Sequence, residues 1–114
     1  MNKATKSDFR ARLNVMRSEL ERDSETTADA RKPVELDQTT VGRLSRMDAM
    51  QTQAMQVEAE RRRQQERKRI DAALARLEDG EFGFCVVCGG DIEAKRIEHD
   101  PTVPNCIDCA RGGS

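Results

Sequence analysis

The sequence contains no tryptophan and no tyrosine, and three phenylalanines are its only aromatic residues. Aromatic side chains contribute much of the buried apolar surface of a globular core. A large core is therefore not expected in a chain of 114 residues, of which 36% are charged. One small domain joined to an extended element fits this composition better than one compact domain.

Other missing features exclude further classes of protein. The first residues are not followed by an apolar run, so no signal peptide is expected. No stretch approaches the roughly 20 apolar residues of a membrane span. The 20 basic and 21 acidic residues give a net charge of −1, which argues against a general nucleic-acid or membrane binder. One histidine and no nucleophile–base set give an enzyme no support. We therefore expect a soluble cytoplasmic protein that is not an enzyme and binds no membrane.

All four cysteines lie in two CxxC pairs, Cys85/Cys88 and Cys106/Cys109, with seventeen residues between the pairs. Two thiolates from each tight turn can occupy the corners of a tetrahedron, and this spacing is typical of zinc sites. We predict one Zn²⁺ bound by these four residues, structural because no coordination position stays open. His99, the single histidine, is then expected at the surface. Two disulfides, a dithiol redox pair and a thiol sensor that releases zinc on oxidation are the alternatives.

A first helix is predicted at about 7–30. It carries an apolar stripe of the a/d type, in which Phe9, Leu13, Met16 and Leu20 recur at spacings of four, three and four. The stripe stops at Leu20, so the rest of this helix is expected to be weakly held.

A second, longer helix is predicted at about 45–79, since no proline or glycine lies between Gly42 and Gly80. Gly80 is a suitable residue to follow its last turn. Two apolar stripes lie along this helix: Met47, Met50, Ala54 and Val57, and then Ile70, Ala73, Leu74 and Leu77.

These elements predict a mainly α fold. Residues 1–79 would form an antiparallel helical hairpin of the coiled-coil type with its tip at about 31–44, and residues 80–114 a small C-terminal zinc finger with four cysteine ligands and a short tail, in a monomer. With the turn centred near Leu36–Asp37, Met16 would lie opposite Val57 and Phe9 opposite about Gln64. The stripe from Ile70 to Leu77 would then extend beyond the overlap. It would pack on the finger through Phe82, Phe84, Ile92 or Ile97.

A basic run separates the two stripes of the second helix. Its positive residues are Arg61, Arg62, Arg63, Arg67, Lys68 and Arg69. A solvated helical face with local ion pairs is one interpretation. The other is a surface that binds a second protein or a nucleic acid, which would make the chain a zinc-ribbon adaptor. No aromatic residues are interleaved with the run, which argues against recognition of single-stranded nucleic acid.

The region around the cysteines resembles a known family. Over residues 70–109 the chain is similar to the signature of DksA/TraR C4-type zinc-finger proteins. The matching residues are Glu81-Phe82-Gly83-Phe84-Cys85, Cys88-Gly89, Asp91-Ile92, Arg96-Ile97-Glu98, Pro101-Thr102 and Cys106-Ile107-Asp108-Cys109. The resemblance implies a protein that binds bacterial RNA polymerase and inserts its hairpin into the secondary channel, where the tip affects transcription initiation. It also implies no catalysis and no binding to a specific DNA sequence.

The tip departs from the family pattern. DksA-type members carry a DxxDxA motif there, and an ungapped count from Cys85 places Gly42, Ser45 and Met47 at those positions. A shifted alignment places Asp37, Thr40 and Gly42 there and recovers one acid. Asp37 and Asp48 are therefore the acidic candidates, and a single acid would weaken any interaction with Mg²⁺ or with basic polymerase elements.

The residues beside the finger also depart from it. In DksA-type members basic residues there help polymerase to bind the alarmone ppGpp, whereas this chain has Asp100 and Ala110 and keeps only Arg69. An acid repels a polyphosphate, so a short DksA-like protein that acts independently of ppGpp is expected.

Overall fold

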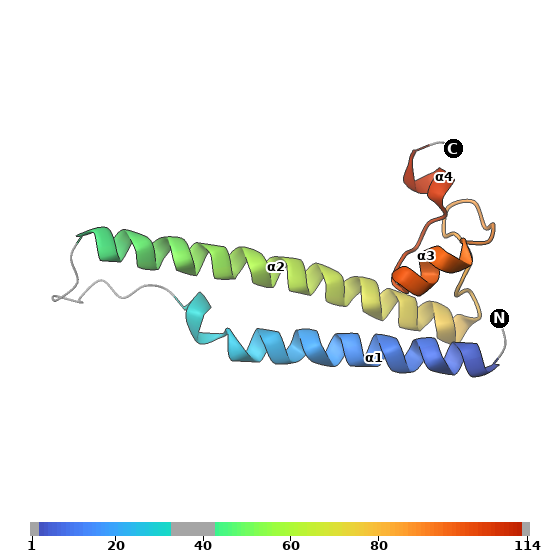
Figure 1. The fold of residues 1–114 in the computed structure, drawn as a ribbon, viewed down its shortest axis with the longest axis horizontal. Coiled ribbons are helices and arrows are strands. Elements are labelled where there is room, and N and C mark those ends of the chain that lie inside the picture. Colours follow the sequence, from blue (N-terminus) through green and yellow to red (C-terminus); the bar gives the residue numbers. More distant parts are fainter. Residues whose placement is uncertain (1–2, 33–42, 113–114) are drawn as a thin grey trace. The chain divides into compact units, whose positions relative to one another are not determined.

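The computed structural model describes residues 3–32 and 43–112, which are mainly helical (Figure 1). Within these residues, extended backbone pairs only in an isolated bridge between Phe84 and Asp91. The predicted mainly α fold is therefore confirmed. The helices are α1 (Lys3–Thr26), the 3₁₀ helix η1 (Asp29–Arg31), α2 (Arg43–Asp79), α3 (Ala94–His99) and α4 (Ile107–Ala110).

Contacts divide the chain into two compact units. The first comprises Met1–Ser18 and Arg67–Ser114, and the second comprises Glu19–Glu66. Each unit contains a part of α1 and a part of α2, and each is described by itself.

In the first unit α1 and α2 run antiparallel. Arg10 pairs with Glu78 across 3.4 Å, and Arg17 pairs with Asp71 across 3.2 Å, so the sequence number on α2 falls as that on α1 rises. The core of this unit combines both helices with the finger. Its buried apolar residues are Leu13, Ile70, Ala73, Leu77, Phe82, Ile92, Ile97 and Val103.

The register expected from a turn at Leu36–Asp37 is wrong. Because Arg17 pairs with Asp71, Met16 lies near that part of α2 and not opposite Val57. In this register Leu13 of the α1 stripe is fully buried, as are Ile70 and Ala73 of the second stripe of α2. Two apolar stripes remove more apolar surface from water than a stripe covered by the stems of arginine side chains would, so this register is the more stable one.

The first stripe of α2 is left exposed by this register. Met47, Met50 and Val57 keep about half of their surface in solvent, at 53%, 52% and 46%. The expected register had paired the stripe of α1 with Met50–Val57 instead. Phe84 is also exposed, at 42%, whereas Phe82, Ile92 and Ile97 are buried as predicted.

The C-terminus of α2 is capped by glycine, as expected. Gly80 has a φ of 75°, a left-handed conformation that an L side chain would strain. The N–H of Gly80 donates to the carbonyl of Leu77, and the N–H of Glu81 donates to the carbonyl of Arg76. This pair of bonds is a Schellman motif, which ends the helix and turns the chain into the finger.

A polar cluster holds the second unit together. Glu60 on α2 accepts hydrogen bonds from Ser24 at the end of α1, from Arg63 and from Gln64, at 2.7–2.9 Å. Arg31 of η1 lies 3.4 Å from the same carboxylate. The side chain of Glu60 is only 17% exposed, so several partners stabilise one partly buried charge.

The hydroxyl of Thr27 extends this cluster. It accepts hydrogen bonds from Arg31 at 2.7 Å and from Arg63 at 3.0 Å. The side-chain amide of Gln53 donates to the carbonyl of Arg31 at 3.1 Å. In this unit hydrogen bonds join α1 to α2, as apolar burial does in the first unit. They explain how α1 is held on α2 beyond the end of its apolar stripe.

Replacing Leu13 with alanine tests the observed register. The change removes a fully buried side chain and is expected to cost about 2–5 kcal/mol of unfolding free energy. Urea denaturation followed by far-UV circular dichroism measures this loss. Val15→Ala on the same helix is the control, because Val15 is 57% exposed and its loss should change stability by less than about 0.5 kcal/mol. Equal effects of the two variants would contradict the register.

Glu60→Gln tests the polar cluster through the pH dependence of stability. The hydrogen bond from Gln64 and those from Arg63 and Ser24, aided by the charge of Arg31, lower the pKa of Glu60 from 4.5 to about 2. Since the folded-state pKa is lowered, this carboxylate stabilises the fold above about pH 4.5, and the stabilisation is lost as the pH falls toward 2. We expect the variant to lose roughly 1–2 kcal/mol at neutral pH and to show a flatter acid limb.

The matched control for this experiment is Glu58→Gln. Glu58 lies on the same helix and pairs with Arg61 and Arg62, its neighbours on α2. Its replacement should leave the stability of the second unit nearly unchanged. If both variants follow the same pH profile, the cluster at Glu60 does not hold the unit.

Candidate metal centre and partner-binding surfaces

The first CxxC pair lies on a tight turn after α2. The N–H of Cys85 donates to the carbonyl of Gly90 at 2.7 Å, and the N–H of Gly89 donates back to the carbonyl of Cys85 at 3.0 Å. Gly89 has a φ of 77°, so a residue with a side chain would be strained there. Backbone N–H groups of Val87 and Gly90 point at the sulfurs of Cys85 and Cys88, each at 3.4 Å. Such bonds stabilise thiolates.

The second pair lies at the start of α4. Cys106 is the N-cap residue of this short helix, and Cys109 lies on it. The N–H of Val86 donates to the carbonyl of Pro104 at 2.9 Å, which ties the first turn to the segment just before the second pair. The seventeen intervening residues thus fold back, as the sequence predicted.

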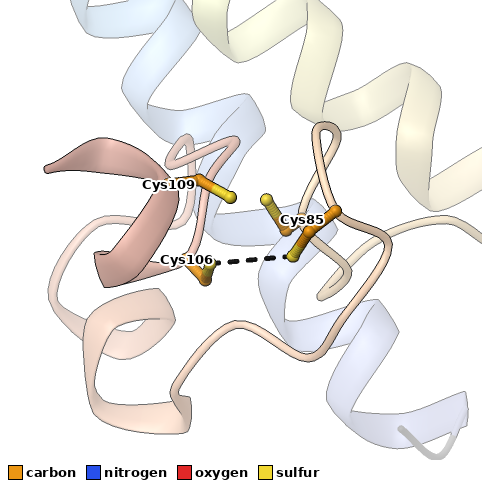
Figure 2. A group of neighbouring side chains, drawn as sticks. Cys85, Cys106 and Cys109 are labelled. Atoms are coloured by element: carbon orange, nitrogen blue, oxygen red, sulfur yellow. Dashed lines mark hydrogen bonds between the residues drawn. The ribbon is translucent and has the colours of Figure 1, made fainter. Parts of the chain in front are cut away.

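The four sulfurs converge on one point (Figure 2). All four Sγ atoms lie within 4.8 Å of one another, and those of Cys88 and Cys106 are 3.8 Å apart. A tetrahedron with metal–sulfur bonds of about 2.3 Å has edges of about 3.8 Å. All four cysteines are free, so the two-disulfide alternative does not describe this structure. The cluster can hold a metal ion.

The pKa values of the cysteines also indicate that the cluster is suited to a metal ion. Hydrogen bonds from the backbone N–H groups of Cys88 and Cys106 lower the pKa of Cys85 to about 6. The neighbouring sulfurs of Cys106 and Cys85 raise the pKa of Cys109 to about 12. Four adjacent thiols cannot all ionise without a counter-charge, because each thiolate repels the next. A bound cation removes this conflict and lets every sulfur act as a ligand.

Three arginine side chains donate hydrogen bonds to backbone carbonyls of the finger, and none of the three was predicted from the sequence to do so. Arg12 of α1 donates to the carbonyl of Glu98 at 2.6 Å, at the end of α3. Arg96 donates to the carbonyl of Asn105 at 3.0 Å, and Arg76 to that of Thr102 at 3.4 Å. No motif marks such contacts, because any long basic side chain can reach a carbonyl. His99 is exposed on α3 and is not part of the sulfur cluster.

The residues expected at the tip are placed only in part. Asp37, Thr40 and Gly42 lie outside the described residues. Ser45 lies in the first turn of α2, which begins at Arg43. Asp48 lies on α2 and is exposed.

The basic run is largely paired within the protein. Arg61 and Arg62 contact Glu58, at 2.6 Å and 3.5 Å, and are 56% and 76% exposed. Arg63 belongs to the cluster at Glu60 and is 17% exposed. Lys68 is exposed, and Arg67 is half-buried and has partners. The structure thus separates these residues into an exposed group and a group used to hold the fold.

Arg69 pairs with Asp100, across 3.1 Å. The same carboxylate accepts hydrogen bonds from the hydroxyl and the N–H of Thr102, at 2.6 Å and 3.0 Å. Burial alone would raise the pKa of Asp100, but these bonds and the charge of Arg69 outweigh it and hold the pKa below its usual value. Asp100 is therefore ionised and neutralises Arg69.

Among the described residues, no helix is long and apolar enough to cross a membrane. No family model matches the chain. Curated relatives do match part of it. The chain is 44% identical over 52 residues to the RNA polymerase-binding transcription factors DksA of Haemophilus influenzae and Escherichia coli K12. These matches cover 43% of this chain and only about a third of each relative, 36% and 34%.

The fold is similar over a much longer range. The solved structure of transcription factor DksA2 from Pseudomonas aeruginosa matches with a TM-score of 0.78 and 25% sequence identity, over 98% of this chain and 84% of that one. The sequence match to DksA, the DksA2-like fold and the four-sulfur cluster agree with one another. The chain is therefore similar to the DksA/TraR C4-type zinc-finger proteins in the sequence of its cysteine region and in its fold.

Proposed function

We propose that this protein regulates transcription by binding bacterial RNA polymerase, with the segment between α1 and α2 entering the secondary channel. The observation that carries the proposal is the similarity to DksA2 over 98% of the chain, joined to the 44% identity with DksA. The protein would act by contact, without catalysis, without a specific DNA sequence and as a monomer. A cytoplasmic location follows from the partner.

Zn²⁺ is the metal proposed for the sulfur cluster. Four cysteine sulfurs at tetrahedral spacing suit Zn²⁺ or an iron centre, and a single closed site of four thiolates on two tight turns is typical of structural zinc. When bound, the ion would supply folding free energy and no chemistry. Cys85, Cys88, Cys106 and Cys109 would hold it, and Arg12, Arg76 and Arg96 would secure the backbone around it.

Independence from ppGpp is part of the proposal, and the ion pair between Arg69 and Asp100 supports it. A polyphosphate would have to displace an intramolecular carboxylate from Arg69 and would be repelled by that carboxylate. Ala110, which is exposed on α4, carries no positive charge that could attract a polyphosphate.

The alternative function is an adaptor that binds protein or nucleic acid through the basic run. Exposure of Arg61, Arg62 and Lys68 supports it. The pairing of Arg63 and Arg69 within the fold weakens it, since these side chains would have to leave their carboxylates.

Binding to purified bacterial RNA polymerase tests the leading proposal. Native mass spectrometry should show a complex of one chain per polymerase at micromolar concentration, and in vitro transcription should change at sensitive promoters. We expect the double variant Asp37→Asn/Asp48→Asn to keep its affinity but lose most of the effect on transcription, because only the tip is altered. Added ppGpp should change neither result.

The control is Asp8→Asn/Asp79→Asn, which removes the same charge from exposed positions on α1 and α2 away from the tip. It should behave as the unaltered protein. Absence of a complex at micromolar concentration would refute polymerase binding. If Arg61→Ala/Arg62→Ala instead abolished binding, with a steep dependence on salt, the adaptor function would be supported.

Removal of the metal tests the cluster. Elemental analysis should find one zinc per chain, and chelation should unfold the finger, since metal binding supplies roughly 10–16 kcal/mol in small zinc peptides. Cys106→Ser should have the same effect in the NMR spectrum of the finger.

The matched variant here is His99→Ala, which should retain one zinc because this residue lies outside the cluster. A folded, metal-free protein with its cysteines joined in disulfides would contradict the proposal.

A further inference from the structure

The first unit contains a cavity that neither the metal nor the tip explains. Its volume is about 460 Å³, within the range of small-molecule sites. Three segments line it: the start of α1, the turn that follows α2, and α3 with the residues before it. All three belong to the same compact unit.

The apolar part of the cavity is aromatic. The rings of Phe9 and Phe82 lie 5.2 Å apart and are tilted by 45°. Ile92 and Ile97, which are both 6% exposed, complete the buried part of the lining. Phe84 also lines the cavity and is 42% exposed. All three phenylalanines of the chain therefore line one cavity, and one of them offers its ring to solvent. An aromatic ring packs well against such a surface.

Two opposite charges line the same cavity. Lys6 comes from α1 and Glu98 comes from α3. Within the part of the chain that the structure describes, neither side chain has an ion pair, and the contact of Glu98 with Arg12 uses only its backbone carbonyl. In the same unit Asp100 already pairs with Arg69, across 3.1 Å, and is not available to a ligand in this way. A ligand could therefore pair with both charges without breaking an ion pair of the fold.

We propose that this cavity binds a small zwitterion with an aromatic body, of the chemical class of the aromatic α-amino acids. Its ring would pack on Phe9, Phe82 and Phe84. Its carboxylate would pair with Lys6 and its ammonium group with Glu98. This site is separate from the sulfur cluster and does not depend on polymerase binding.

Three probes that share one ring separate the contributions. L-Phenylalanine carries both charges, phenylacetate carries only the carboxylate, and phenethylamine carries only the ammonium group. Titration of the zinc-loaded, ¹⁵N-labelled full chain should give a dissociation constant on the order of 1 mM for L-phenylalanine. Shifts should concentrate in the amides of the cavity lining, at Phe9, Phe82, Phe84 and Glu98. Each of the other two probes should bind about threefold to fivefold more weakly.

Matched variants locate the ligand. In Lys6→Ala, L-phenylalanine should bind only as tightly as phenethylamine binds the unaltered protein. In Glu98→Gln, it should bind only as tightly as phenylacetate binds the unaltered protein. The controls Lys95→Ala and Glu93→Gln remove the same charges from α3 and the residue before it, outside the cavity lining, and should change nothing. Phe84→Ala should reduce affinity at least threefold, whereas Val87→Ala, at a 65% exposed position outside the lining, should not.

Three results would overturn the proposal: no chemical-shift change with any probe at ten millimolar or so, equal affinity for all three probes, or unchanged affinity in Lys6→Ala and Glu98→Gln. Both charge variants alter partly or fully exposed side chains, so loss of the fold does not confuse the test.

Discussion

The mutual burial of two apolar stripes is the constraint on which the rest of the first unit depends. Leu13 on α1 and Ile70, Ala73 and Leu77 on α2 leave almost no surface in solvent. Their packing fixes which part of α2 faces α1, and the ion pairs of Arg10 and Arg17 follow that register. It also continues into the finger, because Phe82 and Ile97 belong to the same buried set. The finger therefore does not need a core of its own.

Polar contacts add to the stability that apolar burial provides. The finger is short and rich in turns, so many of its carbonyls have no partner in a helix or sheet. Arg12, Arg76 and Arg96 supply donors to three of them. In the second unit the carboxylate of Glu60 joins several elements, since it contacts the side chains of Ser24, Arg31 and Arg63. A chain with few aromatic residues thus uses its many charges as structural groups.

Because many charges are paired within the fold, the basic run offers fewer free positive side chains than its sequence suggests. A count of positive residues suggests one continuous basic surface, whereas Arg63 and Arg69 are committed to Glu60 and Asp100. The exposed residues of α2 include Met47, Met50 and Asp48, on the half of the helix nearest the connection to α1. Basic residues that are paired within the fold therefore lie next to exposed ones on α2, and the number of positive residues overstates the basic surface left free.

The sequence by itself determined the features that are local. Two CxxC pairs at this spacing predicted the sulfur cluster, because four thiolate ligands spaced in this way are typical of zinc sites. Gly80 predicted the end of α2, because a left-handed residue is needed there. Only the tertiary structure decided the register, since Met47–Val57 and Ile70–Leu77 present similar apolar stripes and periodicity cannot choose between them. It also decided which arginines are paired, because partners such as Arg12 and Glu98 lie 86 residues apart in the chain. Such contacts depend on how the helices pack, and no local pattern encodes them.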